Sequence, residues 1–356
     1  MSHSVFFCNY SVGPRAYEEV SDICAPFGKR ILLLGGRRAL AAGKGRLAEA
    51  LAGSALEIVD AQVYGSDCTM TNIQRWADHA RAVGADMIFG MGGGRALDTA
   101  KGAASEAGLP LFTFPTIAAT CAGMTKLSVI YWENGSLDHF AYARRPPRHC
   151  FIDLEVLAEA PAEYLQAGMG DTIGKFFECH FSARNDRLEH SSALGREISN
   201  MCYAPLVEHG SRALEDCKGK QVSNDLEQSV LAIIVSTGLV STLVLDLYNG
   251  AVAHSTYYGM VTIPGFDETH RHGNVVAYGV LVQLMLDGDR EKALEVKGFL
   301  QSIGIDTTFR EMKVPLERES MAPTLRAIVN APDMKHVPYP IDEDMIFQAM
   351  KEVEAL

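Results

Sequence analysis

The sequence predicts an α/β domain followed by an all-helical domain. Two observations lead to this prediction. In the first part of the chain, short apolar runs alternate with helical patterns across short connections, whereas beyond about residue 153 helical patterns follow one another and strand patterns almost vanish. The length of 356 residues also leaves room for two domains. We expect residues 1–155 to form the α/β domain and residues 156–356 to form the helical domain.

The predicted strands of the first domain are short apolar runs that end at turn residues. They cover residues 29–34, 56–59, 86–90 and 111–114; Gly35-Gly36 ends the first and Pro115 ends the last. Helical patterns lie between them, over residues 39–52 and 71–83. Strands that alternate with helices in this way are parallel and are covered by those helices.

Five long helical patterns follow the boundary. They cover residues 170–184, 188–208, 226–248, 274–286 and 289–303. The stretch from Ser229 to Leu245 contains no charged residue, but it is too polar and slightly too short for a membrane span. We therefore interpret it as a buried helix of the helical domain, and we expect no membrane partner.

Composition and charge exclude several classes of function. The chain is 47% hydrophobic and its formal net charge is −12, which argues against disorder and against nucleic-acid binding. The N-terminus lacks both a basic region and a long apolar region, so we expect no secretory signal. The eight cysteines contain no C-x-x-C pair, which indicates reduced thiols in a cytoplasmic protein rather than a disulfide framework or a zinc knuckle.

A glycine-rich turn follows the third predicted strand and opens a helix. It runs from Gly90 to Arg95, and Asp98 and Lys101 follow in the helix. Glycine allows a phosphate to approach the backbone closely, and the helix N-terminus supplies free N–H groups for an anion. Because Arg95 replaces the third glycine of the dinucleotide fingerprint and no Gly-Lys-Ser/Thr follows, neither standard phosphate motif is present. A purely structural turn is the alternative.

Small and hydroxylated residues dominate the loop after the fourth predicted strand. This loop runs from Pro115 through Cys121 to Tyr131. Such a composition suits contact with a sugar or an amide. The alternative is a Ser/Thr-rich turn followed by a hairpin.

Three residues of the second domain form a candidate metal site. Asp171 follows two glycines, His254 lies among small apolar residues, and His272 is two residues after His270. A carboxylate and two imidazoles suit zinc or iron with open coordination positions. Simpler interpretations also exist, since Asp171 could be a helix N-cap and His254 a core histidine. His270 and His272 alternate, so they are not expected to face one site on a helix.

Together these segments resemble the iron-containing alcohol dehydrogenase superfamily, particularly its glycerol dehydrogenase branch. The resemblance covers nearly the whole chain and keeps the family order. The matching segments are Gly92–Gly94 with Asp98 and Lys101, Pro115–Ala118, Leu127–Tyr131, Gly168–Thr172, Ala253-His254, His272-Gly273 and Val276–Gly279. The resemblance implies a Rossmann-like nucleotide-binding domain and an all-α domain, which is the architecture of the dehydroquinate synthases. It also implies a homo-oligomer.

The resemblance implies that Asp171, His254 and His272 hold one divalent metal. Iron-type members carry a further histidine four residues after the aspartate, where this chain has Lys175, so Zn²⁺ is favoured over Fe²⁺. The implied cofactor is NAD(P)(H). Its implied binding residues are Gly36, Arg37, Gly92, Gly93, Gly94, Arg95, Asp98, Thr116, Ala119, Thr125, Leu127 and Tyr131. The metal would bind the alcohol or polarise the carbonyl of a small molecule, and the nicotinamide would exchange the hydride.

Three departures from the family bear on specificity, and the third is Asn274, which replaces the usual glutamate after His-Gly and bears on the support of the metal ligand. The first concerns the cofactor. NAD-preferring relatives carry an aspartate after the first strand, which hydrogen-bonds the ribose 2′-OH. This chain has Gly36 there, followed by Arg37 and Arg38. Losing an acid and gaining arginines permits a 2′-phosphate, so we predict that NADP(H) is accepted and preferred. The alternative is that both arginines are a solvated helix start.

The second departure is Cys121, where glycerol dehydrogenases carry an aspartate beside the polyol. Thr120-Cys121-Ala122 and Tyr278-Gly279 more closely resemble bacterial hydroxycarboxylate dehydrogenases, which reduce 2-oxo acids. Replacing a carboxylate by a thiol removes repulsion toward an anionic substrate. Lys126 would add attraction, unless it is a surface lysine.

We therefore predict an oxidoreductase for 2-oxo and 2-hydroxy acids. Glycerol and dihydroxyacetone are the alternative substrates. A lyase of the dehydroquinate synthase type and a nucleotide-binding protein without catalysis are the less favoured alternatives.

Overall fold

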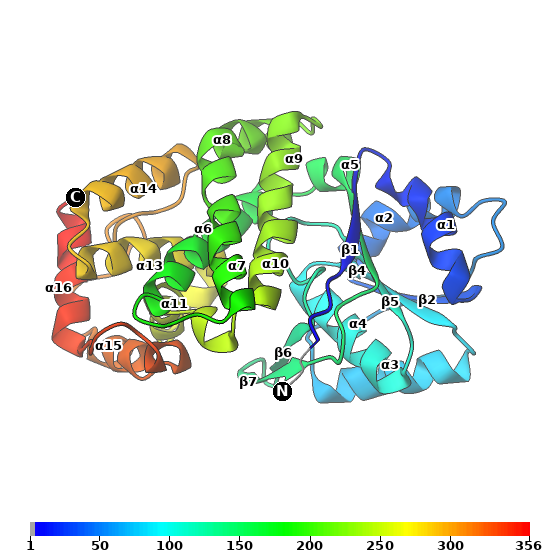
Figure 1. Cartoon of the computed structure of the whole chain (residues 1–356), viewed down its shortest axis with the longest axis horizontal. Helices are drawn as coiled ribbons and strands as arrows, with labels where there is room; N and C mark the ends of the chain where they lie inside the picture. The colour runs from blue at the N-terminus through cyan, green and yellow to red at the C-terminus, as the bar shows by residue number, and fades with distance from the viewer. Residues whose placement is uncertain (1–3) are drawn as a thin grey trace. The chain divides into compact units, whose positions relative to one another are not determined.

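The computed structural model describes residues 4–356 and divides them into two compact units (Figure 1). The first unit comprises the chain up to Ala162 together with Glu215–Thr242. The second comprises Glu163–Leu214 and Leu243–Leu356.

The first unit is built on a six-stranded parallel sheet of order β1-β8-β5-β4-β2-β3. The strands are β1 (Asn9–Gly13), β2 (Arg30–Gly35), β3 (Glu57–Val63), β4 (Met87–Gly92), β5 (Leu111–Pro115) and β8 (His149–Asp153). The central strands are buried on both faces, which is why their sequences are continuous apolar runs. A separate antiparallel hairpin joins β6 (Leu127–Tyr131) to β7 (Leu137–Tyr142).

Helices cover both faces of this sheet. They include α2 (Arg37–Ala50), α3 (Met70–Ala82) and α4 (Gly94–Ala107), with the short helices α1 (Val20–Cys24) and α5 (Leu154–Ala158). Because side chains alternate along a strand, Ile31 and Leu33 enter one core cluster, whereas Leu32 and Leu34 enter the other. Single 3₁₀ turns occur at Ala16–Glu19 and Ala25–Phe27.

The four predicted strands are all present, but two further strands of the six-stranded sheet were not predicted. β1 lies at the edge of the sheet and its sequence, NYSVG, is too polar and exposed to give an apolar run. β8 is fully buried, yet its short sequence includes His149 and Asp153 and so resembles a connection. Edge position and length explain why pattern alone missed them.

The second unit is helical, and no strand occurs in Glu163–Leu214 or Leu243–Leu356. The longer helices are α6 (Ala162–Ser182), α7 (His190–Ile198), α8 (Ala204–Lys218), α11 (Val252–Met260), α13 (His272–Leu286), α14 (Arg290–Ser302), α15 (Ala322–Val329) and α16 (Glu343–Glu354). The short helix α12 spans Phe266–Thr269, and 3₁₀ turns occur at Ser199–Cys202, Asp246–Tyr248 and Pro332–Lys335. The predicted α/β and all-helical fold class is therefore confirmed.

Two predicted helices are interrupted. The pattern over 188–208 divides into α7 and α8 around a 3₁₀ turn, because Pro205 favours the first turn of a new helix. The pattern over 226–248 divides into α9 (Asn224–Leu231), a π-helical turn (Ala232–Ser236) and α10 (Thr237–Leu243). By length and composition alone Asn224–Leu243 could cross a membrane, but 67% of its apolar window is buried inside the protein, as expected of a core helix.

The apolar segment Asn224–Leu243 packs in a different unit from the one that we predicted. We expected it in the helical domain, but Glu215–Thr242 belongs to the first unit. Within that unit the thiol of Cys217 faces the backbone carbonyls of Leu157 and Ala160, and a Cβ on Gly238 would lie 2.6 Å from the Cβ of Met124. From Ser229 to Leu245 no charged residue marks a solvent-facing side, so this part of the sequence could not reveal its partner. The predicted domain boundary between residues 155 and 156 stays a prediction.

Candidate metal centre and cofactor site

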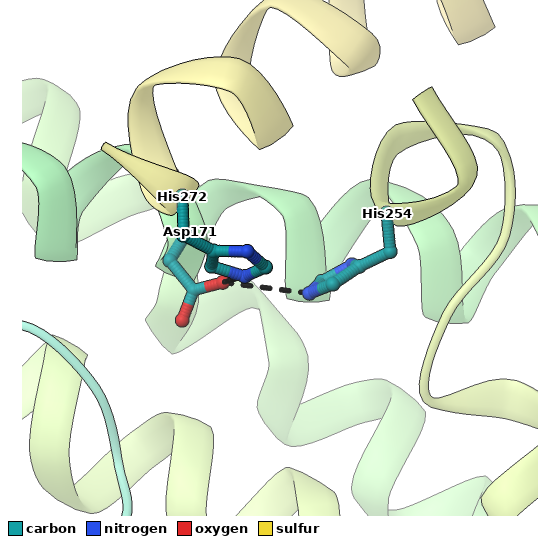
Figure 2. A group of neighbouring side chains, drawn as sticks. All are labelled: Asp171, His254 and His272. Atoms are coloured by element: carbon teal, nitrogen blue, oxygen red, sulfur yellow. Dashed lines mark ion pairs between the residues drawn. The ribbon is translucent and has the colours of Figure 1, made fainter. Parts of the chain in front are cut away.

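The three predicted metal ligands lie together in the second unit, on three different helices (Figure 2). Asp171 lies in the middle of α6, His254 near the start of α11, and His272 is the first residue of α13. One ligand atom from each lies within 4.8 Å of the other two. The interpretation of Asp171 as an N-cap is wrong, because α6 begins nine residues earlier at Ala162.

Both imidazoles direct Nε2 at the same carboxylate oxygen. Nε2 of His254 lies 3.4 Å and Nε2 of His272 lies 3.2 Å from Oδ1 of Asp171 (Figure 2). His270 does not join them: its ring stacks on Phe266 at 4.1 Å between centroids, as the alternation of His270 and His272 predicts.

Small residues beside the ligands let the helices approach backbone to backbone. Gly170 precedes Asp171 and Gly273 follows His272. A Cβ on Gly273 would lie 1.8 Å from the carbonyl oxygen of Ala167, and a Cβ on Gly170 would lie 2.4 Å from that of Gly273. This close crossing of α6 and α13 sets the separation of the Asp171 and His272 ligand atoms.

The α11–α13 crossing is formed in the same way. A Cβ on Gly279 would lie 2.6 Å from the carbonyl oxygen of Ala253, the residue before His254. Each ligand is therefore next to a residue at which two helices touch through their backbones.

Glu178 holds His254, and sequence analysis missed this residue. Its side chain is completely buried, one oxygen accepts the backbone N–H groups of Ala251 (2.7 Å) and His254 (2.8 Å), and the other accepts from Nδ1 of His254 at 2.5 Å. Proton donation from Nδ1 leaves the Nε2 lone pair available to a metal. The signal in the sequence is spacing, since Glu178 follows Asp171 by seven residues and so shares its face of α6.

The carboxylates of this cluster are held ionised. Burial alone would raise the pKa of Asp171, but hydrogen bonds from His254 and His272 lower it well below its usual range. Burial would likewise raise the pKa of Glu178, but His254 lowers it. Burial would lower the pKa of His254, but Glu178 and then Asp171 raise it. Metal binding must therefore displace a proton from an imidazole.

Lys175 is not a fourth ligand. Its ammonium group donates to the carbonyl oxygen of Asn249 at 2.6 Å and to the side-chain oxygen of Asn249 at 3.1 Å. Lys175 and Glu178 therefore both anchor the segment that leads into α11. The donor set that remains, one carboxylate and two imidazole nitrogens, fits a divalent cation with open positions.

The glycine turn lies in the first unit, at the carboxyl ends of neighbouring parallel strands. β4 ends at Gly92, Gly93 is the N-cap of α4, and Gly94 is its first residue. The φ angle of Gly92 is 149°, which favours glycine, and a Cβ there would lie 2.9 Å from the Cβ of Ala96. A Cβ on Gly94 would meet only the Thr120 hydroxyl, at 3.6 Å, so the helix N-terminus is open to an anion.

The other two predicted cofactor segments converge on this turn. The N–H of Gly36, which follows β2, donates to the carbonyl oxygen of Met91 at 3.3 Å. The N–H of Thr116, which follows β5, donates to the carbonyl oxygen of Gly92 at 3.2 Å. The ends of β2, β4 and β5 therefore form one continuous edge, where ligands bind in open parallel sheets.

Asp98 and Arg95 have protein partners in this site. Asp98 forms a buried ion pair with Lys101 at 2.8 Å and accepts the backbone N–H of Val129 at 3.0 Å, so it fixes α4 to β6. The guanidinium of Arg95 pairs with Asp67 at 2.7 Å and lies 5.1 Å from the Tyr131 ring centroid.

The remaining predicted cofactor residues differ in exposure. Arg37 and Arg38 are exposed in the first turn of α2, and no side chain caps its N-terminus at Gly36. Thr116 and Thr125 are buried, whereas Ala119 and Leu127 are partly buried.

Cys121 is partly buried in the loop after β5, within the first unit. Its carbonyl oxygen accepts the N–H of Met124 at 2.9 Å, and its Cβ lies 3.8 Å from the Cβ position of Gly238 in α10. Lys126 is exposed, with its ammonium 5.7 Å from the Tyr142 ring centroid. All eight cysteines lie among residues 4–356, and none of them forms a disulfide bond there.

Comparison with known proteins places this chain in a family. The model of the iron-containing alcohol dehydrogenases matches residues 9–154. A glycerol dehydrogenase from Thermotoga maritima is 31% identical over 305 residues, which cover 83% of this chain and 82% of the relative. The chain belongs to the iron-containing alcohol dehydrogenase family. Hydroxycarboxylate dehydrogenase A from Escherichia coli is 30% identical over 356 residues, which cover 98% of this chain and 96% of the relative.

Solved structures agree with this assignment. The crystal structure of a probable glycerol dehydrogenase from Sinorhizobium meliloti matches with a TM-score of 0.85 at 25% identity, and the match covers 99% of each chain. The chain is therefore an oxidoreductase that acts on CH–OH donors, of a family with a divalent metal site. The predicted class of enzyme is confirmed.

Proposed function

We propose that this member of the family transfers a hydride between NADP(H) and a 2-oxo or 2-hydroxy acid, and that it uses one zinc ion held by Asp171, His254 and His272. The observation that carries the proposal is the convergence of both Nε2 atoms on Oδ1 of Asp171, at 3.4 and 3.2 Å. Zinc is favoured because the ammonium of Lys175 is held by Asn249 and offers no lone pair, which leaves three protein ligands and an open position.

The chain's own residues prepare this centre for chemistry. When bound, the divalent metal supplies a Lewis acid to the substrate oxygen and the nicotinamide supplies or accepts the hydride. Glu178 keeps the proton of His254 on Nδ1, so that Nε2 is the donor atom. The backbone crossings at Gly170, Gly273 and Gly279 keep the three ligand atoms at a fixed separation.

The first unit supplies the proposed cofactor site. The N-terminus of α4 at Gly93 and Gly94 presents free N–H groups to the pyrophosphate. Exposed Arg37 and Arg38 at the start of α2 supply positive charge for a 2′-phosphate, and no acidic residue occurs in the first turn of α2.

The substrate proposal depends on Cys121. A thiol there removes the carboxylate charge that an aspartate would carry, and with it the repulsion toward a substrate carboxylate. The similarity to hydroxycarboxylate dehydrogenase A over 98% of the chain supports the same substrate class.

Glycerol is the second candidate substrate. The similarity to the glycerol dehydrogenase of Thermotoga maritima favours it, and both candidates would use the same metal centre. The two proposals differ in the charge of the substrate, so a direct comparison of substrates separates them.

The test is a matrix of substrates and cofactors measured with and without a chelator. 2-Oxobutyrate and 2-oxoglutarate are compared with glycerol and related diols, each with the phosphorylated and unphosphorylated nicotinamide. We expect the highest kcat/KM for a 2-oxo acid with NADPH, and we expect the chelator to abolish it. Highest kcat/KM for glycerol with NAD⁺ would overturn both the substrate and the cofactor proposal.

A further inference from the structure

The two imidazoles of the candidate metal centre are supported differently. The side chain of His254 is 15% exposed and its Nδ1 is held by the buried carboxylate of Glu178. The side chain of His272 is 38% exposed, and among residues 4–356 its one polar partner is Asp171. Within the described residues, His272 therefore has no second carboxylate beyond Asp171 that could fix its orientation as Glu178 fixes that of His254.

An aromatic ring contacts His272 instead. The ring of Tyr257 meets the ring of His272 with centroids 4.3 Å apart and planes at 82°. Tyr257 follows His254 by three residues on α11, so both side chains lie on one face of that helix. The same short helix thus supplies one ligand and the surface against which the other ligand packs.

The geometry of this contact constrains the plane of the imidazole. Edge-to-face contact is a preferred arrangement of two rings, and a rotation of the His272 ring about its Cβ–Cγ bond would lose it. That rotation would also turn Nε2 away from Asp171, since the 3.2 Å contact depends on the ring plane. The ring of Tyr257 would therefore orient the imidazole of His272, as the carboxylate of Glu178 orients that of His254.

We propose that Tyr257 is a positioning residue for His272, which it orients for metal binding through its ring. The proposal rests on the metal centre of the proposed function. It does not depend on which substrate or nicotinamide the enzyme uses.

The test measures metal affinity in the absence of substrate. Metal-stripped wild-type protein and the variants Tyr257→Leu, Tyr257→Met and Tyr257→Phe are titrated with Zn²⁺ against a chromophoric chelator. The visible spectrum of the Co²⁺ form is recorded for each. Groups that orient a metal ligand typically change metal affinity by about 10–100-fold when they are removed. We expect a loss of at least about tenfold and an altered Co²⁺ spectrum in Y257L and Y257M. In Y257F, which keeps the ring, both should stay close to wild type.

A matched control separates orientation from general packing. Tyr339 contacts Phe181 edge-to-face in the same unit, with centroids 5.7 Å apart, and its hydroxyl donates to Asp287 at 3.0 Å. Tyr339→Leu therefore removes a similar ring contact, together with one hydrogen bond, without touching a ligand. We expect Y339L to bind Zn²⁺ like wild type. If Y257L is less stable than Y339L, the more flexible side chain of Y257M provides the decisive comparison.

The outcomes distinguish this proposal from the metal assignment itself. Wild-type Zn²⁺ affinity and spectrum in Y257L and Y257M would overturn the role of Tyr257. A loss in Y257F equal to that in Y257L would overturn the role of the ring and assign the effect to the hydroxyl. Failure of the wild-type protein to bind Zn²⁺ or Co²⁺ would overturn the proposed metal centre.

Discussion

The close crossing of α6 and α13 makes Gly273→Ala the most informative single change. The added Cβ would lie 1.8 Å from the carbonyl oxygen of Ala167, whereas real Cβ atoms keep at least about 3.0 Å from such an atom. The obstruction is helix backbone, so it cannot be relieved by a side-chain rotation. The two helices must separate by about 1 Å at the point where Asp171 and His272 meet.

This displacement is large compared with what a metal site tolerates. Metal–ligand bonds in proteins stay within about 0.2 Å of their ideal lengths. A shift of about 1 Å therefore removes His272 or Asp171 from the coordination shell, while overpacking of this kind costs about 1–3 kcal/mol of stability. We expect Gly273→Ala to lower Zn²⁺ affinity by at least about tenfold and to lower turnover with it.

Chelator competition and kcat/KM measure these effects, and two other glycines calibrate them. Gly298 in α14 has no atom within 4 Å of its Cβ position, so Gly298→Ala should retain Zn²⁺ affinity and gain about 0.5–1 kcal/mol of stability. A Cβ on Gly174 would lie 2.7 Å from a methyl carbon of Val276 and in ordinary contact with Oε2 of Glu178 (3.6 Å) and Cε1 of His254 (3.9 Å), so Gly174→Ala should have an intermediate effect. Wild-type affinity and turnover in Gly273→Ala would refute the argument that this crossing sets the ligand separation.

Four further predictions follow from individual side chains. Glu178→Gln keeps the shape of the side chain but removes its charge, so Zn²⁺ affinity should fall by about 10–100-fold in a chelator titration; unchanged affinity would contradict its role. Replacement of Arg37 and Arg38 by serine should lower kcat/KM with NADPH by about tenfold or more and leave NADH almost unaffected. Cys121→Asp should reduce kcat/KM for a 2-oxo acid by at least about tenfold, because it places a like charge beside the substrate; an equal loss with a neutral diol would argue against that cause. Burial lowers the pKa of His149 to about 4, so the unfolded chain binds this proton first as pH falls, and unfolding measurements should show about 2 kcal/mol of stability lost between pH 7 and pH 5. This loss should be absent in His149→Asn.

The fold could be predicted from sequence where the residue pattern of a single element is enough to identify it. β2, β4 and β5 are apolar runs that end at glycine or proline, and their burial on both faces produces such runs. β1 could not be predicted because an edge strand pairs on one side and tolerates polar residues. The packing of α10 on the first unit could not be predicted, because the stretch from Ser229 to Leu245 has no charged residue to indicate its orientation.

The metal ligands were predicted through resemblance to a family, whereas the residues that hold those ligands in place were not predicted. Spacing in the chain does not bring Asp171, His254 and His272 together, since more than eighty residues separate the first two. Tyr257 became visible only in three dimensions, and the sequence marks Glu178 only by its spacing from Asp171, because each acts on a residue that belongs to another motif or another helix. Gly170, Gly273 and Gly279 were part of the motifs. Their role is to allow contact between helix backbones, and a sequence does not show which backbones are in contact.

The central claim is that Asp171, His254 and His272 hold a divalent metal on which turnover depends. The most direct measurement is the metal content of the purified protein, followed by its activity after chelation and after addition of Zn²⁺, with Asp171→Asn and His254→Gln measured alongside. We predict one ion per chain, loss of turnover on chelation, recovery with Zn²⁺, and folded but inactive variants that retain no metal. Full turnover by metal-free protein, or by either variant, would contradict the account.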